Sequence, residues 1–184
     1  MPNTDSDTSL LGRKIMVVGC PGSGKSTFAR KLQDYNGIPL YHLDMFYHRP
    51  DKTITPSDEF DSKVEELCQK EEWILDGNYM RTIPLRIYYA DTIFWLDYEQ
   101  DVCVQSVLNR VGQKRDDMPW VEETIDPKFL QFVKDFHTNG NPILEVYFRE
   151  AELLCKNTYR FKAREEADKF LENLQQQGDK HETD

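Results

Sequence analysis

A glycine-rich loop directly after an apolar segment constrains the fold of this 184-residue chain more than any other feature. Residues 14–18 (KIMVV) are strand-sized, and residues 19–26 (GCPGSGKS) then match the pattern G-x-x-x-x-G-K-[ST] in full. Glycines let the backbone wrap around a polyphosphate with successive N–H groups pointing inward. The residues expected to contact a nucleotide are Gly19, Pro21, Gly22, Ser23, Gly24, Lys25, Ser26 and Thr27.

Three residues of this loop carry the expected chemistry. Lys25 is expected to reach the β- and γ-phosphates and to act in catalysis, and the Ser26 hydroxyl to ligate Mg²⁺. Thr27 is expected to contact the α-phosphate side. The helix that follows adds the partial positive charge of its N-terminus. The loop therefore predicts ATP and Mg²⁺ as the ligands.

Short apolar segments alternate with helical patterns along the whole chain. Strands are expected near 14–18, 39–43, 73–75, 92–96 and 158–161, and helices near 25–35, 57–68, 99–111, 127–136, 142–154 and 167–174. Parallel strands need a crossover to return the chain, so this alternation predicts a parallel sheet. We expect an α/β three-layer sandwich with a five-stranded parallel sheet and a short helical lid at about 111–125.

One domain is expected over residues 13–175, after a disordered polar lead-in at 1–12 and before a polar tail at 176–184. Residues 1–13 lack the basic start and apolar stretch of a signal peptide. No run approaches the roughly 20 apolar residues of a membrane span. We therefore expect a cytoplasmic protein without a membrane partner.

Acidic residues follow several of the predicted strands, where ligands of a parallel sheet bind. Asp44 is expected to orient an acceptor hydroxyl, with His42 on the same strand face in a structural role. Asp76 follows Trp-Ile-Leu, the Walker B pattern, and is expected to hold Mg²⁺ and to lie near the substrate. Asp97 has the same local form, but we expect it to cap the helix from Glu99.

Arginines complete the predicted site. Arg81 and Arg86 follow the third strand, where an anionic substrate would bind. Arg110 and Arg115 flank a polar stretch with the properties of a lid, and lid arginines can neutralise charge on a transferring phosphoryl group. We therefore predict substrate binding by Arg81 and Arg86, and catalytic roles for Arg110 and Arg115. For each, the alternative is an ordinary surface ion pair.

Five motifs carry a resemblance to a known family: G-C-P-G-S-G-K-S-T, I-P-L-Y-H-L-D, W-I-L-D-G-N-Y, A-D-T-I-F-W-L-D and R-x-x-x-K-R-D-D-M. The chain resembles the bacterial DNA topology modulation proteins, within the adenylate-kinase-like P-loop kinases, from about residue 14 to 174. The resemblance implies strand order 2-3-1-4-5 and a nucleoside monophosphate contact for Arg81. It also places Arg110 and Arg115 near the lid arginines. Asn78, in the D-G-N-Y motif, is predicted to bind substrate.

We predict ATP- and Mg²⁺-dependent phosphoryl transfer to a small acceptor, such as a nucleotide or nucleoside. Two alternatives stay open: a nucleotide-binding switch or ATPase that acts through a protein partner, and a regulator of DNA topology. With 33 acidic and 23 basic residues the formal net charge is −10. Because DNA binding relies on phosphate neutralisation, this charge argues against nucleic acid as a direct partner.

Overall fold

Five parallel strands form one central sheet in the computed structural model, which describes residues 11–181, with side chains as far as 176. The order is β2-β3-β1-β4-β5, as predicted. The strands are β1 (Lys14–Gly19), β2 (Leu40–His42), β3 (Trp73–Asp76), β4 (Thr92–Leu96) and β5 (Asn157–Phe161). Because all neighbours pair in parallel, every strand ends at the same edge of the sheet.

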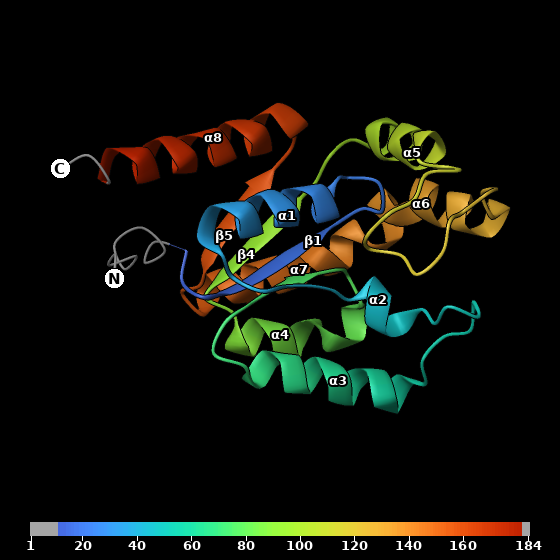
Figure 1. Cartoon of the computed structure of the whole chain (residues 1–184), viewed down its shortest axis with the longest axis horizontal. Coiled ribbons are helices and arrows are strands. Elements are labelled where there is room, and N and C mark those ends of the chain that lie inside the picture. The colour runs from blue at the N-terminus through green and yellow to red at the C-terminus, as the bar shows by residue number, and fades with distance from the viewer. Residues whose placement is uncertain (1–10, 182–184) are drawn as a thin grey trace.

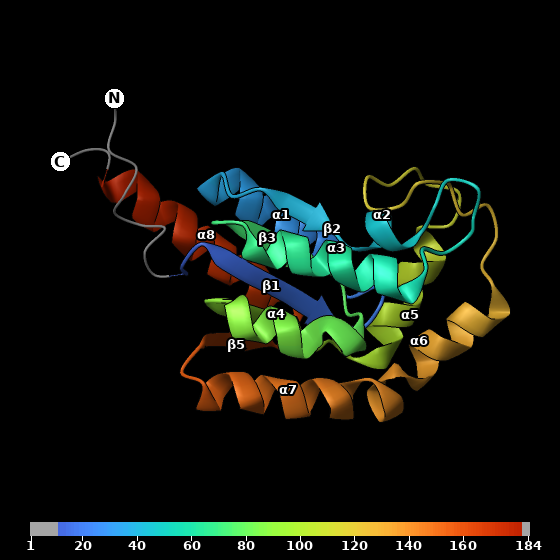
Figure 2. The same ribbon diagram turned by 90° about the horizontal axis from the view of Figure 1, so that it is seen from below.

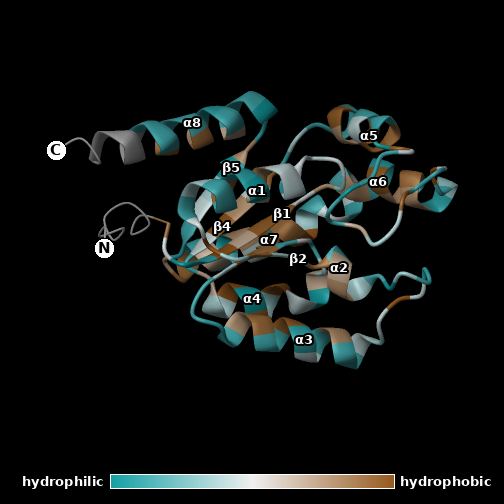
Figure 3. Cartoon of the chain, viewed as in Figure 1, coloured by the Kyte–Doolittle hydropathy of each residue, from teal (hydrophilic) through white to brown (hydrophobic). Residues whose placement is uncertain are grey.

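Helices cover both faces of the sheet and complete the predicted three-layer sandwich (Figures 1 and 2). Helices α1 (Lys25–Asn36) and α8 (Arg164–His181) lie on one face. Helices α3 (Ser57–Gln69), α4 (Ile83–Tyr89) and α7 (Asn141–Leu153) lie on the other. The three central strands, β1, β3 and β4, are almost wholly buried, which explains why they read as continuous apolar runs, whereas the edge strands β2 and β5 are mostly half-buried. Figure 3 shows this apolar centre under polar outer helix faces.

The remaining elements gather at the carboxyl edge of the sheet (Figure 1). They are α2 (Asp44–Tyr47), the 3₁₀ turn η1 (Met80–Thr82), α5 (Gln100–Asn109) and α6 (Pro127–Asn139). Between α5 and α6 lies the predicted lid, here residues 110–126, which consists of turns and irregular chain rather than a helix of its own. Glycine, proline and like-charged side chains in this stretch explain the lack of a helix.

The boundaries of the predicted domain differ from expectation at both ends. Leu11, expected in a disordered lead-in, is buried, and its carbonyl accepts a hydrogen bond from the Thr92 hydroxyl. Residues 1–10 of that lead-in lie outside the described residues. The polar tail continues α8 as far as His181, and 182–184 are likewise not described. Within the described part of the chain, no helix is long and apolar enough to cross a membrane.

Asp97 does not cap α5 as expected, since Glu99 holds that position. Its buried carboxylate instead pairs with Arg160 at 2.7 Å and with Lys162, both on the segment that contains β5. Asn141 at the start of α7 donates to the same carboxylate at 2.7 Å. Asp97 therefore fastens β4 to β5 and α7. Its partners lie 44 or more residues away in sequence, so no local pattern could have shown them.

Candidate active site

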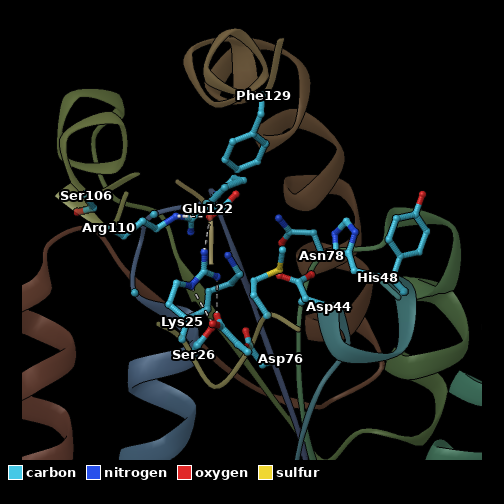
Figure 4. Close-up of a pocket in the computed structure, with 18 of the residues that line it drawn as sticks. Lys25, Ser26, Asp44, His48, Asp76, Asn78, Ser106, Arg110, Glu122 and Phe129 are labelled. Carbon is cyan, nitrogen blue, oxygen red and sulfur yellow. Dashed lines mark hydrogen bonds and ion pairs between the residues drawn. The ribbon is translucent and has the colours of Figure 1, made fainter. Parts of the chain in front are cut away.

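A cleft of about 1580 Å³ opens at the carboxyl edge of the sheet, between the phosphate loop, α2, the lid and α6. Figure 4 shows Lys25, Ser26 and Asp76 at one end of it, with Arg110 and Phe129 reaching in from the lid side. The position agrees with the rule that open parallel sheets bind ligands beyond the carboxyl ends of their strands. The predicted residues that line the cleft are Pro21, Gly22, Gly24, Lys25, Ser26, Thr27, Asp44, Asp76, Asn78, Arg110 and Arg115.

The phosphate loop has the backbone geometry that its glycines predict. Gly24 adopts φ 90° at the N-cap of α1, so the helix begins at Lys25. Gly22 has φ 88°, and a Cβ there would lie 2.3 Å from the carbonyl oxygen of Cys103. A side chain at position 22 would therefore force the loop away from α5. Lys25 Nζ donates to the Cys20 carbonyl at 3.1 Å, within the loop itself.

Two of the predicted loop residues do not line the cleft. Ser23 is buried beneath the loop, and Gly19 lies at the end of β1. Gly19 is held by Asn78, whose side-chain oxygen accepts the Gly19 N–H at 3.0 Å and whose amide donates to the Gly19 carbonyl at 2.7 Å. Asn78 lines the cleft, and its amide also fixes the entrance of the phosphate loop.

Asp76 and Ser26 offer oxygen ligands that fit a magnesium ion. His42 bonds one carboxylate oxygen of Asp76 through Nδ1 at 2.8 Å, which fixes the orientation of that side chain. The other oxygen, Oδ1, is buried and has no hydrogen-bond partner among the described residues. Nor do the described residues contain any group of three or more His, Cys, Asp or Glu side chains arranged to hold a metal. Magnesium in phosphoryl-transfer sites characteristically takes one or two protein ligands plus phosphates and water, so this sparse set fits it.

Asp44 lies at the start of α2 and accepts a hydrogen bond of 2.6 Å from the Tyr79 hydroxyl. Burial raises the pKa of Asp44, and the bond from Tyr79 opposes that shift only in part. Tyr79 itself adopts φ 38°, a left-handed conformation that bulky residues seldom take. The turn after β3 therefore accepts backbone strain where it places this hydroxyl against Asp44.

The lid is fastened to the phosphate loop by an acidic residue that the sequence reasoning did not single out. Arg115 makes a bidentate pair with Asp117, each bond 2.9 Å, and a third bond of 2.9 Å to Glu122. Asp117 also accepts a 2.5 Å hydrogen bond from Ser26. Arg110 Nε lies 3.4 Å from Glu122 Oε2, and its guanidinium packs over the Phe129 ring.

Asp117 is ionised in this arrangement. Burial by itself would raise its pKa, but the hydrogen bonds from Arg115 and Ser26 outweigh burial and hold the pKa below its usual range. The only sequence signal for Asp117 was its place in the R-D-D run, where Asp116 is an equally good candidate. Asp116 is largely exposed, 3.8 Å from Arg30.

Arg81 and Arg86, both expected to bind substrate, do not line the cleft. Arg86 is fully buried and donates to the carbonyls of Gly77, at 2.8 Å, and of Asn78. Burial lowers its pKa to about 10, so it stays a cation at neutral pH. Arg81 is exposed and pairs with Asp61 of α3 at 2.9 Å. The expectation for Arg86 is wrong because its guanidinium is already committed to the backbone of the turn after β3.

Comparison with known proteins supports the architecture. No protein-family model matches the chain. Over 77 residues it is 29% identical to adenylate kinases of Thermotoga maritima and Thermotoga petrophila, a stretch of 42% of this chain. The matched stretch covers about a third of the length of those relatives, 34%. The comparisons do not show the resemblance to DNA topology modulation proteins, which stays a prediction.

Solved structures match over nearly the full chain. A shikimate kinase from Acinetobacter baumannii, solved with shikimate, aligns with a TM-score of 0.57 at 17% identity, over 92% of this chain and 97% of the other. A gluconokinase from Sinorhizobium meliloti aligns at 0.56 and 14%, over 92% and 93%. Together with the sheet order and the phosphate loop, these matches show that the chain has a P-loop kinase-like fold.

Proposed function

We propose that the protein transfers the γ-phosphoryl group of ATP to a hydroxyl of a small acceptor. The observation that carries this proposal is that one cleft holds the phosphate loop, the unpartnered oxygen of Asp76, the Asp44 carboxylate and two lid arginines. Phosphoryl transfer depends mainly on positioning and on charge stabilisation, and these groups supply both. The fold shared with two solved kinases is consistent with it.

Each residue has a role that its place permits. Lys25 and the loop N–H groups bind the triphosphate, and Arg110 and Arg115 face the transferring group from the lid. Asp44 accepts the proton of the acceptor hydroxyl as that oxygen bonds to the γ-phosphorus and the bond to the β–γ bridging oxygen breaks. Ser26 and Asp76 would hold magnesium, which when bound neutralises charge on the phosphate oxygens.

The direct test is the release of ADP from Mg·ATP across a panel of nucleosides, nucleoside monophosphates, sugars and hydroxy acids, with Lys25→Ala as the blank. An acceptor that raises turnover about 100-fold over water, about 2.7 kcal/mol of activation free energy, would name the reaction. If ATP binds but no acceptor raises turnover, the proposal is contradicted and a nucleotide-dependent switch becomes the better description.

Tyr79→Phe is expected to move the acid limb of the pH–rate profile to higher pH. The Tyr79 hydroxyl stabilises the Asp44 carboxylate, so its removal raises a pKa that burial has already raised. Asp44 then protonates at higher pH, and the protonated form cannot accept the acceptor proton. The rate at alkaline pH should change little, because Asp44 is ionised there in both proteins.

The measurement is kcat/KM from pH 4 to 9, with Tyr88→Phe as the matched control because Tyr88 is 73% exposed. An acid limb that stays in place in Tyr79→Phe would remove Asp44 from the role of base.

A further inference from the structure

The cleft has two ends of different chemistry. Most of its cations come from the phosphate loop, α1, the lid and the start of α8: Lys25, Arg30, Arg110, Lys114, Arg115 and Arg164. This donor end suits the triphosphate. The acceptor end consists of the residues that follow β2 and β3 together with one lid residue: Asp44, Tyr47, His48, Tyr79, Met80 and Trp120.

The acceptor end is poor in groups that bind anions. None of the described residues assigned to it is an arginine, and its lysine, Lys52, is exposed on the loop after α2. Lys25, Arg110 and Arg115 act on Asp44 electrostatically, but they belong to the donor end. The arginines expected for an anionic substrate, Arg81 and Arg86, are committed to α3 and to buried carbonyls. At its centre lies the Asp44 carboxylate, which repels an anion. A phosphate or carboxylate bound here would have no cation of its own to offset its desolvation and would compete with the triphosphate for Lys25, Arg110 and Arg115.

The same end is rich in flat rings, which we call the aromatic wall: Tyr47, His48, Tyr79 and Trp120. The centroids of the Tyr47 and Tyr79 rings lie 4.9 Å apart, and the Tyr47 ring also packs against the Phe60 ring. The lid contacts the rest of this wall, because the centroids of the Trp120 and His48 rings lie 5.3 Å apart. Aromatic side chains stack on nucleobases without needing charge. A molecule with a flat ring would therefore be enclosed between α2 and the lid.

Resting on the proposed function, we propose that the acceptor is an uncharged alcohol with a flat unsaturated ring, a nucleoside, and that a nucleoside monophosphate or a hydroxy acid is not the substrate. The aromatic wall recognises the base, and Asp44 receives the hydroxyl. The phosphoryl group moves from ATP to that hydroxyl oxygen, so ADP and a nucleoside monophosphate are the products. The acceptor needs no phosphate of its own for binding.

Binding can be measured without turnover. Wild-type protein saturated with Mg²⁺ and a non-hydrolysable ATP analogue, which fills the donor end, is titrated calorimetrically with nucleosides and with their 5′-monophosphates. At least one nucleoside should bind about 10-fold more tightly than its own monophosphate. Tighter binding of the monophosphates, or no binding of either set, would overturn the inference.

Trp120 provides a variant pair for the aromatic wall. Trp120→Ala should weaken nucleoside binding about 10-fold, whereas Trp120→Phe, which keeps a flat ring, should restore most of it. Equal affinities in the two variants would show that the ring is not used for stacking.

Met80 provides the converse test, since it lines the acceptor end without charge. Met80→Arg should tighten monophosphate binding about 10-fold by supplying the missing cation, and Met80→Leu should not. Unchanged monophosphate affinity in Met80→Arg would contradict this placement of the acceptor.

The panel of acceptors separates the two proposals. If nucleosides bind as expected but none is phosphorylated, the proposed transfer fails while the assignment of the acceptor end stands. If a monophosphate or a hydroxy acid such as shikimate is phosphorylated faster than every nucleoside, the transfer stands and the assignment of an uncharged acceptor is overturned.

Discussion

Lys25→Ala is expected to lower kcat about 100- to 1000-fold while leaving the folded state intact. The ammonium group acts on charge that develops on the transferring phosphoryl group, and no other lysine comes from the phosphate loop. Among the described residues, the Lys25 side chain hydrogen-bonds only to the Cys20 carbonyl of the same loop, so the sheet does not depend on it. Steady-state kinetics and thermal unfolding of the same preparations measure the two effects.

Lys31→Ala is the matched control for this prediction. Lys31 lies on the same helix, α1, and its side chain is 48% exposed in an ion pair of 2.7 Å with Asp168. Removing a surface pair of this kind costs little stability, and Lys31 does not line the cleft. If Lys25→Ala kept near-normal turnover with unchanged stability, the phosphoryl-transfer proposal would fail.

Arg86→Met is expected to reduce the free energy of unfolding by about 3 kcal/mol, which corresponds to about 6–12 °C in Tm for a chain of this length. The guanidinium is fully buried, and its donors satisfy carbonyls of Gly77, Asn78 and, at 3.4 Å, Tyr79. Methionine fills a similar volume but donates nothing, so buried acceptors lose their partners. Thermal and urea unfolding measure the loss.

Arg86→Met should also lower activity, because Arg86 holds the turn after β3 in place. From this turn, Asn78 hydrogen-bonds to Gly19 of the phosphate loop and Tyr79 hydrogen-bonds to Asp44. Arg81→Ala is the control, because Arg81 makes a surface pair with Asp61 and its loss should cost less than about 1 kcal/mol. A large loss of stability in Arg81→Ala, or none in Arg86→Met, would contradict this division of roles.

The sequence was sufficient to predict those features that depend on residues close together along the chain. The glycine pattern of residues 19–26 predicted a phosphate loop, because positive φ and an open helix N-terminus are properties of consecutive residues. Alternating strands and helices predicted the parallel sheet, because the chain needs a crossover, usually a helix, between the end of one parallel strand and the start of the next. The expected strand order required the family resemblance, and the observed order agrees with it.

Core faces were less certain even where the helix was right. Within the helix predicted near 99–111, the apolar residue Leu108 is 40% exposed, whereas Cys103 is buried. Helix α5 (Gln100–Asn109) packs against α6, and this packing rather than the apolar spacing of α5 decides which of its side chains are buried.

By itself, the sequence determined the phosphate loop, the layered sheet and the edge at which a site would form. Only the tertiary structure decided what each charged side chain does there. Arg86, Asp97 and Asp117 look alike as polar residues near strand ends or in the lid, but their partners come from other segments of the chain. A buried charge must find a partner, and that partner is fixed by how the elements pack, which is why Arg86 supports the backbone and Asp117 fastens the lid.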